Sequence, residues 1–372
     1  MASHYFLERA ISVAIYAFIS MIFCNQISSS KTNVRKVLFF LTIILSALAY
    51  FFQPTESMDL HRLWITADDY NKYPLLEMTT KIFSGWTSPL GLVYVCGISK
   101  INHHLLPSLT AFLFYTNITY IVSDYWKKNE ISNSSVALVL FLFLSRGVYG
   151  EVISGIRSML AFSFVARCIY DETYNNKSFL WNIPIYIIVS LFHSAAMGAI
   201  AVWFVLKILF GQKGIKRIIY IPVLVLAVGV FYYFWGDVVT RNLDMGLARL
   251  GAGDSYFYIW EFVFNSLYMF ISLLILWRTA RFSSLTSEGK RMKYIVTSFY
   301  VVSIICISSY SIYHRFISFT TMFSLPVLIE IMNNCEQNDR VVPKKNLLIL
   351  AVIMMVLSGL KGNLNGIRFF TF

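Results

Sequence analysis

Long apolar runs recur along almost the whole of this 372-residue sequence, and short polar segments separate them. Hydrophobic residues make up 57% of the chain and charged residues 13%, whereas roughly 25% of the residues of a soluble domain are charged. Only helices that satisfy their own backbone polar groups, or closed barrels, cross a bilayer. The sequence therefore predicts an all-α, polytopic integral membrane protein, with 1–372 forming a single transmembrane domain.

We expect about 12 membrane-spanning helices, although several apolar runs are shorter than the roughly 20 residues that a span needs. The N-terminal run has no small-residue cleavage site after it, so we expect it to be retained as a span. Residues 84–101 contain glycines, serines and Pro89, and they predict a further span or else a re-entrant or interfacial segment. The apolar runs are 10–24, 37–52, 105–123, 135–149, 152–170, 179–193, 195–212, 217–235, 258–277, 294–313, 316–332 and 346–360.

The net charge of +12 indicates which loops are cytoplasmic and does not indicate nucleic-acid binding. The Lys and Arg residues lie between apolar runs and form no basic stripe with interleaved aromatic residues, so we expect no nucleic-acid partner. Basic loops are typical of the cytoplasmic side. If 84–101 does not cross the membrane and the N-terminus is outside, the densest basic clusters, 207–217 and 278–293, are cytoplasmic. This topology, which we favour, makes 53–104 and 236–257 outer segments.

Isolated polar residues then fall on the outer face of the membrane. Three pairs of apolar runs, 135–170, 179–212 and 294–332, form hairpins whose tips point outwards, and these tips and the two outer segments carry the candidate site residues. In chain order they are Asp59, Arg62, Arg146, Glu151, Arg157, His193, Arg249, His314 and Arg315. The five cysteines lie mostly in or beside apolar runs, at spacings that fit neither disulfides nor a metal site. We expect no metal and no cofactor.

Arg157 is the most costly of these residues, because an arginine near the centre of a spanning helix costs about 2.5–3.5 kcal/mol to insert. Two interpretations remain open. The guanidinium reaches the headgroups and pairs with Glu151, or it lines a cavity and binds an anion. Small residues at helical spacing permit the close approach that a cavity needs; they are Ser154, Gly155, Ser158 and Ala161. The planar guanidinium suits a phosphate group.

His193 interrupts an uncharged stretch, 178–206, that is too long for one ordinary span and short for two. We expect the chain to turn there. The imidazole is either a structural group or one that orients or deprotonates a sugar hydroxyl. His314 and Arg315 similarly lie midway in an uncharged stretch, at a plain loop or at a site. Arg146 is interpreted mainly as part of a turn, next to Gly147.

These segments resemble the EpsG-like, Wzy-type polysaccharide polymerases from about residue 37 to residue 332. "ISGIRSMLAFSF" resembles the family's "iRqglA" segment, and "IIVSLFHSAAMGA" resembles the "lfHksA" segment that follows it. "MDLHRLWITADDY", "TSPLGLVYVCGIS" and "YSIYHRFISFTT" occupy the places of its outer loop, its "EPlfylL" stretch and its late arginine segment. Ser158 replaces the family's usual Gln, and Ser88 replaces its Glu.

The resemblance implies a glycosyltransferase of the bacterial inner membrane that works on the periplasmic face. Such enzymes join oligosaccharide repeat units carried on undecaprenyl pyrophosphate into O-antigen, capsule or exopolysaccharide, and a chain-length regulator is an expected partner. We expect Arg157 and Arg315 to stabilise the pyrophosphate leaving group, and His193 to orient or activate the acceptor hydroxyl, in a metal-independent, inverting reaction. Asp59, Arg62, Arg146, Glu151, Arg249 and His314 are the expected substrate-binding residues.

Two other functions remain open from the residues themselves. A membrane acyltransferase also places a lone histidine within the bilayer, but its thioester donor would come from the cytoplasmic side. A flippase or another transporter of lipid-linked oligosaccharides also places Arg and His along a substrate pathway, and inverted repeats would support it. We find no internal repeat in the sequence.

Overall fold

A computed structural model describes residues 2–29, 31–56, 58–211, 259–277, 285–337, 344–361 and 367–369. Within these ranges the regular structure is entirely helical, which confirms the predicted all-α class. The predicted outer segment 236–257, with Arg249, and the apolar run 217–235 lie outside the described residues.

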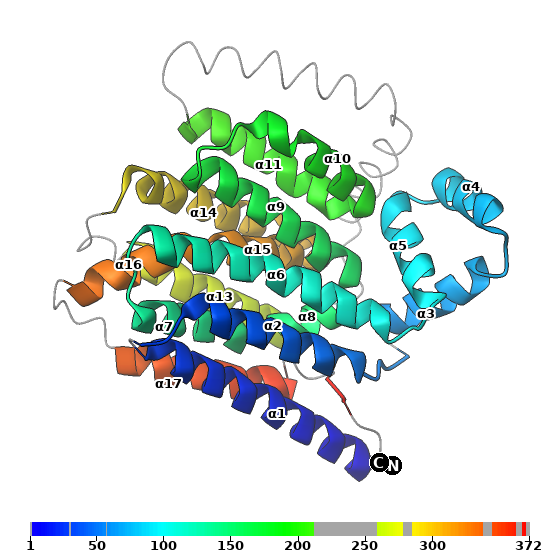
Figure 1. The fold of residues 1–372 in the computed structure, drawn as a ribbon, viewed down its shortest axis with the longest axis horizontal. Helices are drawn as coiled ribbons and strands as arrows, with labels where there is room; N and C mark the ends of the chain where they lie inside the picture. Colours follow the sequence, from blue (N-terminus) through cyan, green and yellow to red (C-terminus); the bar gives the residue numbers. More distant parts are fainter. Residues whose placement is uncertain are drawn as a thin grey trace.

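Figure 1 shows the long helices side by side in a bundle, with α3, α4 and α5 gathered beyond one end of it. Two short 3-10 helices, η1 (Phe179–Asn182) and η3 (Cys306–Ser308), precede α10 and α15. The helices are α1 (Ala2–Ser28), α2 (Val34–Tyr50), α3 (Asp59–Tyr70), α4 (Leu75–Gly85), α5 (Pro89–Ser99), α6 (Leu105–Lys128), α7 (Asn133–Ser145), α8 (Val148–Ser154), α9 (Ile156–Tyr174), α10 (Ile183–Phe192), α11 (Ser194–Gly211), α13 (Ile259–Trp277), α14 (Ser287–Ile305), α15 (Tyr310–Phe323), α16 (Leu325–Gln337) and α17 (Lys344–Lys361).

Two of the described helices are long and apolar enough to cross a membrane: α1, over Phe6–Ser28, and α6. Two bent pairs also qualify if each is one span, namely α7 with α8, bent by 54°, and α15 with α16, bent by 51°. By length and composition the described ranges therefore hold two to four candidate spans. Other apolar helices are shorter, because turns divide the apolar runs. Large apolar side chains are exposed on the bundle surface, as lipid contact requires; examples are Phe18, Phe40, Ile188, Phe270 and Val356.

Helix caps and carboxylates join several helices at one end of the bundle, which we call the capped end. Ser132 and Thr286 cap α7 and α14 through their side-chain oxygens. Glu330 accepts hydrogen bonds from the Thr286 N–H at 2.6 Å and the Tyr125 hydroxyl at 3.0 Å, and Glu336 accepts one from the Ser132 hydroxyl at 2.7 Å. Unpaired N–H groups at a helix N-terminus favour such negative charges.

The hairpin of α10 and α11 has its base at the capped end. Glu172, near the end of α9, accepts hydrogen bonds from the Asn182 amide at 3.0 Å and from the Lys207 ammonium at 2.5 Å. Asn182 precedes α10 and Lys207 lies late in α11, so the open end of the hairpin lies at Glu172. His193, between the two helices, therefore lies at the far tip, and the predicted turn there is confirmed.

The structure adds detail to one predicted outer segment and corrects the position of one predicted turn. The first part of the predicted outer segment 53–104 is largely helical, since α3 and α4 lie in it. The charged residues of these two helices keep the mean hydropathy low although both helices have an apolar face. His314 and Arg315 do not lie at a turn. The turn is at Cys306–Ser309, one and a half helical turns earlier.

Of residues 84–101, the first two end α4, and most of the rest form one short helix, α5. Its 11 residues span about 16 Å at 1.5 Å per residue, whereas the hydrocarbon core of a bilayer is about 30 Å thick. This helix is therefore too short to cross a membrane alone. We call α3, α4 and α5 together the arm, and the end of the bundle beside them the arm end.

Candidate functional site

Interruptions in the helices at the arm end carry most of the candidate site residues. Gly147, with a φ of 83° that glycine adopts readily, separates α7 from α8, and Gly155 separates α8 from α9. His193 separates α10 from α11 with an extended backbone. Each interruption leaves main-chain polar groups outside the helical ladder, so polar side chains are accommodated there at lower cost than in a continuous helix.

Arg157 lies in the first turn of α9, just after the interruption at Gly155. Its guanidinium carbon is 6.0 Å from the centre of the Trp86 ring, at the limit of a cation–π contact. Asp59 is near enough for its charge to act on the guanidinium. No hydrogen bond or salt bridge links Arg157 to another residue of the described ranges, and Glu151 pairs with Arg146 instead. The donors of Arg157 are thus available to an anion.

His193 is 8% exposed. The main-chain N–H of Ala195 fixes the orientation of its ring. The Nδ1 atom accepts a hydrogen bond from the Ala195 N–H at 3.2 Å. A neutral imidazole that accepts at Nδ1 carries its proton on Nε2. The Ala195 hydrogen bond therefore favours the Nε2–H tautomer, which suits a role in orienting a hydroxyl or phosphate oxygen better than a role in removing a proton.

The start of α5 brings Arg157 and the tip of the α10–α11 hairpin together. The Ser88 hydroxyl oxygen accepts a hydrogen bond from the Ser194 N–H at 3.2 Å. A methyl group on Gly91 would overlap the carbonyl oxygen of Phe192 and would lie 3.0 Å from Cδ of Arg157. Gly91 thus lies between Arg157 and the residue that precedes His193. Two segments far apart in the sequence meet across one turn of α5, and only glycine permits that approach.

A second group of charged residues is buried between α7, α8, α13 and α15. Arg146 Nη2 lies 3.0 Å from Glu151 Oε1, and it donates to Asn265 Oδ1 at 3.0 Å and to the Ser318 hydroxyl at 2.8 Å. His314 Nε2 is 3.7 Å from the same oxygen of Glu151, and its Nδ1 is 3.0 Å from Asn265 Nδ2. Asn265 therefore orients both Arg146 and His314, and Glu151 lies between them.

The remaining predicted residues are less closely gathered. Arg315 is half-buried in α15, and as the neighbour of His314 it projects from a different face of that helix. Asp59 and Arg62 form an exposed ion pair of 2.7 Å within α3, a kind of pair that contributes roughly 0–1 kcal/mol. Arg249 lies outside the described residues. Three of the predicted residues, Arg157, His193 and Asp59, are thus brought to the start of the arm.

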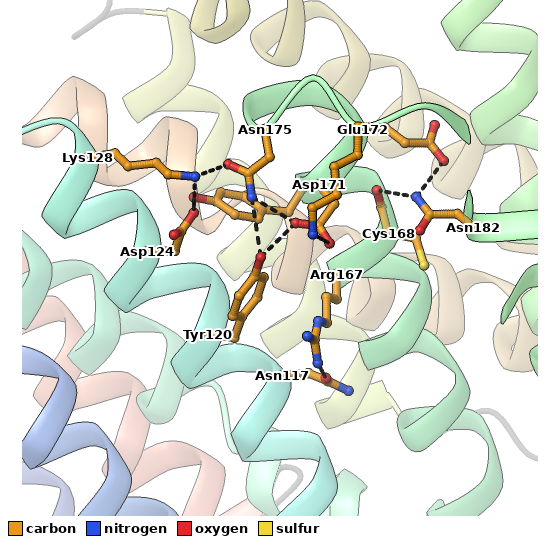
Figure 2. A network of polar contacts seen from close by, with 12 residues as sticks. Asn117, Tyr120, Asp124, Lys128, Arg167, Cys168, Asp171, Glu172, Asn175 and Asn182 are labelled. Atoms are coloured by element: carbon orange, nitrogen blue, oxygen red, sulfur yellow. Dashed lines mark hydrogen bonds and ion pairs between the residues drawn. The ribbon is translucent and has the colours of Figure 1, made fainter. Parts of the chain in front are cut away.

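A polar network at the capped end was missed by the sequence analysis. Figure 2 shows it between α6, α9 and the start of α10. Asp171 accepts hydrogen bonds from the Tyr120 hydroxyl at 2.8 Å and from Lys177 at 2.9 Å, and this bond raises the pKa of the Lys177 ammonium. Arg167 donates to Asn117 at 3.2 Å. Acidic residues at the end of the apolar run 152–170, Asp171 and Glu172, were the available signal in the sequence.

No three His, Cys, Asp or Glu side chains are grouped as ligands of one metal ion in the part of the chain that the structure describes. Comparisons of the chain with models of protein families, with curated proteins and with solved structures find no match. We therefore infer the function from the arrangement of the site residues and from the resemblance of the sequence segments.

Proposed function

We propose that this chain is a polymerase that joins lipid-pyrophosphate-linked oligosaccharide repeat units at the periplasmic face of a bacterial inner membrane. In this proposal the chain crosses the membrane about 12 times, and the arm end faces the periplasm. The observation that carries the proposal is the Arg157 guanidinium. No described carboxylate forms a salt bridge with it, and it lies across one turn of α5 from the hairpin tip that bears His193.

The reaction requires a cation where the leaving group departs. The acceptor hydroxyl oxygen attacks the anomeric carbon of the donor, while the bond from that carbon to the pyrophosphate oxygen breaks. The pyrophosphate leaves with the electron pair, and the proton of the acceptor hydroxyl passes to the departing pyrophosphate or to water. A guanidinium placed at the developing negative charge stabilises that transition state without a metal ion. We assign this role to Arg157, with Arg315 as a second cation.

His193 and the buried charged group take supporting roles in this proposal. The Nε2–H of His193 donates a hydrogen bond that orients the acceptor hydroxyl or a phosphate oxygen. Glu151 and His314 are candidate ligands of the sugar, and Arg146 holds Glu151 in place. Asp59, Arg62 and Arg249 stay candidate sugar-recognition residues of the outer segments.

The experiment that tests the proposal compares the surface glycan of cells with and without this chain. Cells that lack a polymerase should display glycan of a single repeat unit in place of the long-chain ladder, as resolved by gel electrophoresis of the glycolipid. Cells that lack a flippase would display no repeat unit. Cells that lack an acyltransferase would keep the normal ladder with an altered mass per repeat. Either of the last two results would contradict the proposal.

A further inference from the structure

Helix α4 of the arm exposes an apolar face. Leu75, Leu76 and Phe83 are 69%, 81% and 44% exposed, whereas Met78 and Ile82 are buried and α4 packs against α5. Since successive residues of a helix are roughly 100° apart, the three exposed side chains share one face, next to the buried one. Water is an unfavourable neighbour for such a face.

The opposite face of α4 is polar. Glu77 and Lys81 form a salt bridge of 3.0 Å across one helical turn, and the exposed Ser84 lies on the same side. The Lys81 ammonium also lies 3.4 Å from the centre of the Tyr73 ring. A lysine with a tyrosine beside it is typical of the region where phospholipid headgroups meet acyl chains.

Paired charges leave α3 and α4 without a strong field of either sign. Three of their four acidic residues form ion pairs, namely Asp59–Arg62, Asp69–Lys72 and Glu77–Lys81, and the fourth, Asp68, lies 3.1 Å from Nε2 of His103 in the linker after α5. A highly charged macromolecule would find no complementary surface here. The exposed apolar face of α4 is therefore the feature that selects a partner. An uncharged lipid surface can bind this face without any complementary charge.

The position of α4 in the fold points to the same partner. The chain passes from α4 through Trp86 into α5, which packs against α10 and approaches Phe192 at Gly91. If the apolar helices α10 and α11 lie within the bilayer, their tip is at its outer surface, and α4, which ends six residues before Gly91, lies near that level. Figure 1 likewise shows α4 beyond the end of the bundle helices.

We propose that α4 is an in-plane interfacial helix that docks on the phospholipids of the outer leaflet. Leu75, Leu76 and Phe83 enter the boundary between headgroups and acyl chains, and Lys81 reaches back to the headgroups. The proposal rests on the orientation assumed in the proposed function, but not on the reaction. A docked α4 holds Trp86 and Ser88 beside Arg157, where a lipid-borne substrate would arrive.

Fluorescence of the full-length protein in phosphatidylcholine vesicles tests this docking. The probe is the environment-sensitive dye NBD on Leu76→Cys, and the matched control is Ser84→Cys on the polar face. Only Cys306 needs replacement by serine, because the other four cysteines are buried. We expect blue-shifted emission at position 76 and quenching by spin-labelled lipid at least ~3-fold stronger than at position 84.

Two results would overturn the docking. Equal, weak quenching at both positions would place α4 in water. Blue-shifted emission at position 76 without quenching by spin-labelled lipid would show that protein, such as a second copy of the chain, covers the helix. The same measurement in Arg157→Ala separates this proposal from the polymerase assignment, since the quenching should persist in that variant whether or not the chain makes polymer.

Discussion

Replacing Arg157 with alanine should lower polymer formation at least ~100-fold, the loss that follows removal of one preorganised charge-stabilising donor. Because Arg157 forms no hydrogen bond or salt bridge with the described residues, the substitution should leave the amount of folded protein in the membrane almost unchanged. The measurement is the glycan ladder of deletion cells that carry each variant, normalised to the protein recovered from their membranes. Arg157→Lys should give an intermediate ladder, because lysine keeps the charge but loses the bidentate geometry.

Arg167→Ala is the matched control for this substitution. Arg167 lies on the same helix, α9, about 15 Å further along. It donates to Asn117, and its guanidinium carbon lies 4.3 Å from the centre of the Tyr120 ring. The control should lower the yield of folded protein and leave the ladder of the folded fraction long. Long polymer in Arg157→Ala, or loss of polymer only in proportion to lost protein, would show that Arg157 has no catalytic role.

Glu151→Ala should cost about 3–5 kcal/mol of folding free energy, because it leaves the buried charge of Arg146 without its carboxylate. The two side chains are 0% and 7% exposed. The loss is a large part of the roughly 5–15 kcal/mol that stabilises a typical protein, so we expect little monodisperse protein after detergent extraction. The measurement is the fraction that elutes as a single species, with its thermal unfolding midpoint.

An exposed ion pair supplies the control for the buried one. Glu77→Ala removes the partner of Lys81, at 50% and 43% side-chain exposure, and should cost less than about 1 kcal/mol. Combining Glu151→Ala with Arg146→Met should recover much of the lost stability, since it removes both members of the buried pair. A Glu151→Ala protein as stable as Glu77→Ala would contradict a structural role for the Arg146–Glu151 pair.

Helices with continuous apolar character were the most predictable part of the fold. The run at 105–123 corresponds to α6, and the break at His193 follows from the length of an uncharged stretch. Helices α3 and α4 were not predicted, because averaging hydropathy along the chain hides an apolar face beside charged residues. Their pattern of apolar side chains at helical spacing was the signal that a search for amphipathic helices would have used.

The candidate site divides in a similar way. Arg157 and His193 stand out because each interrupts an apolar segment, which is a local property of the sequence. The hydrogen-bond partners of Arg146 cannot be recognised in the sequence. Asn265 and Ser318 lie more than 100 positions away along the chain, and only tertiary packing brings them to Arg146. The glycine at position 91 could not be recognised as a contact between Arg157 and Phe192 for the same reason.

The most direct test of the polymerase assignment uses purified protein in vesicles with lipid-pyrophosphate-linked repeat units as the sole substrate. We predict lipid-linked products of two and more repeat units by mass spectrometry, with release of lipid pyrophosphate, and none of these products from Arg157→Ala. If the protein is folded and the substrate is recovered with a single repeat unit, the polymerase assignment is wrong.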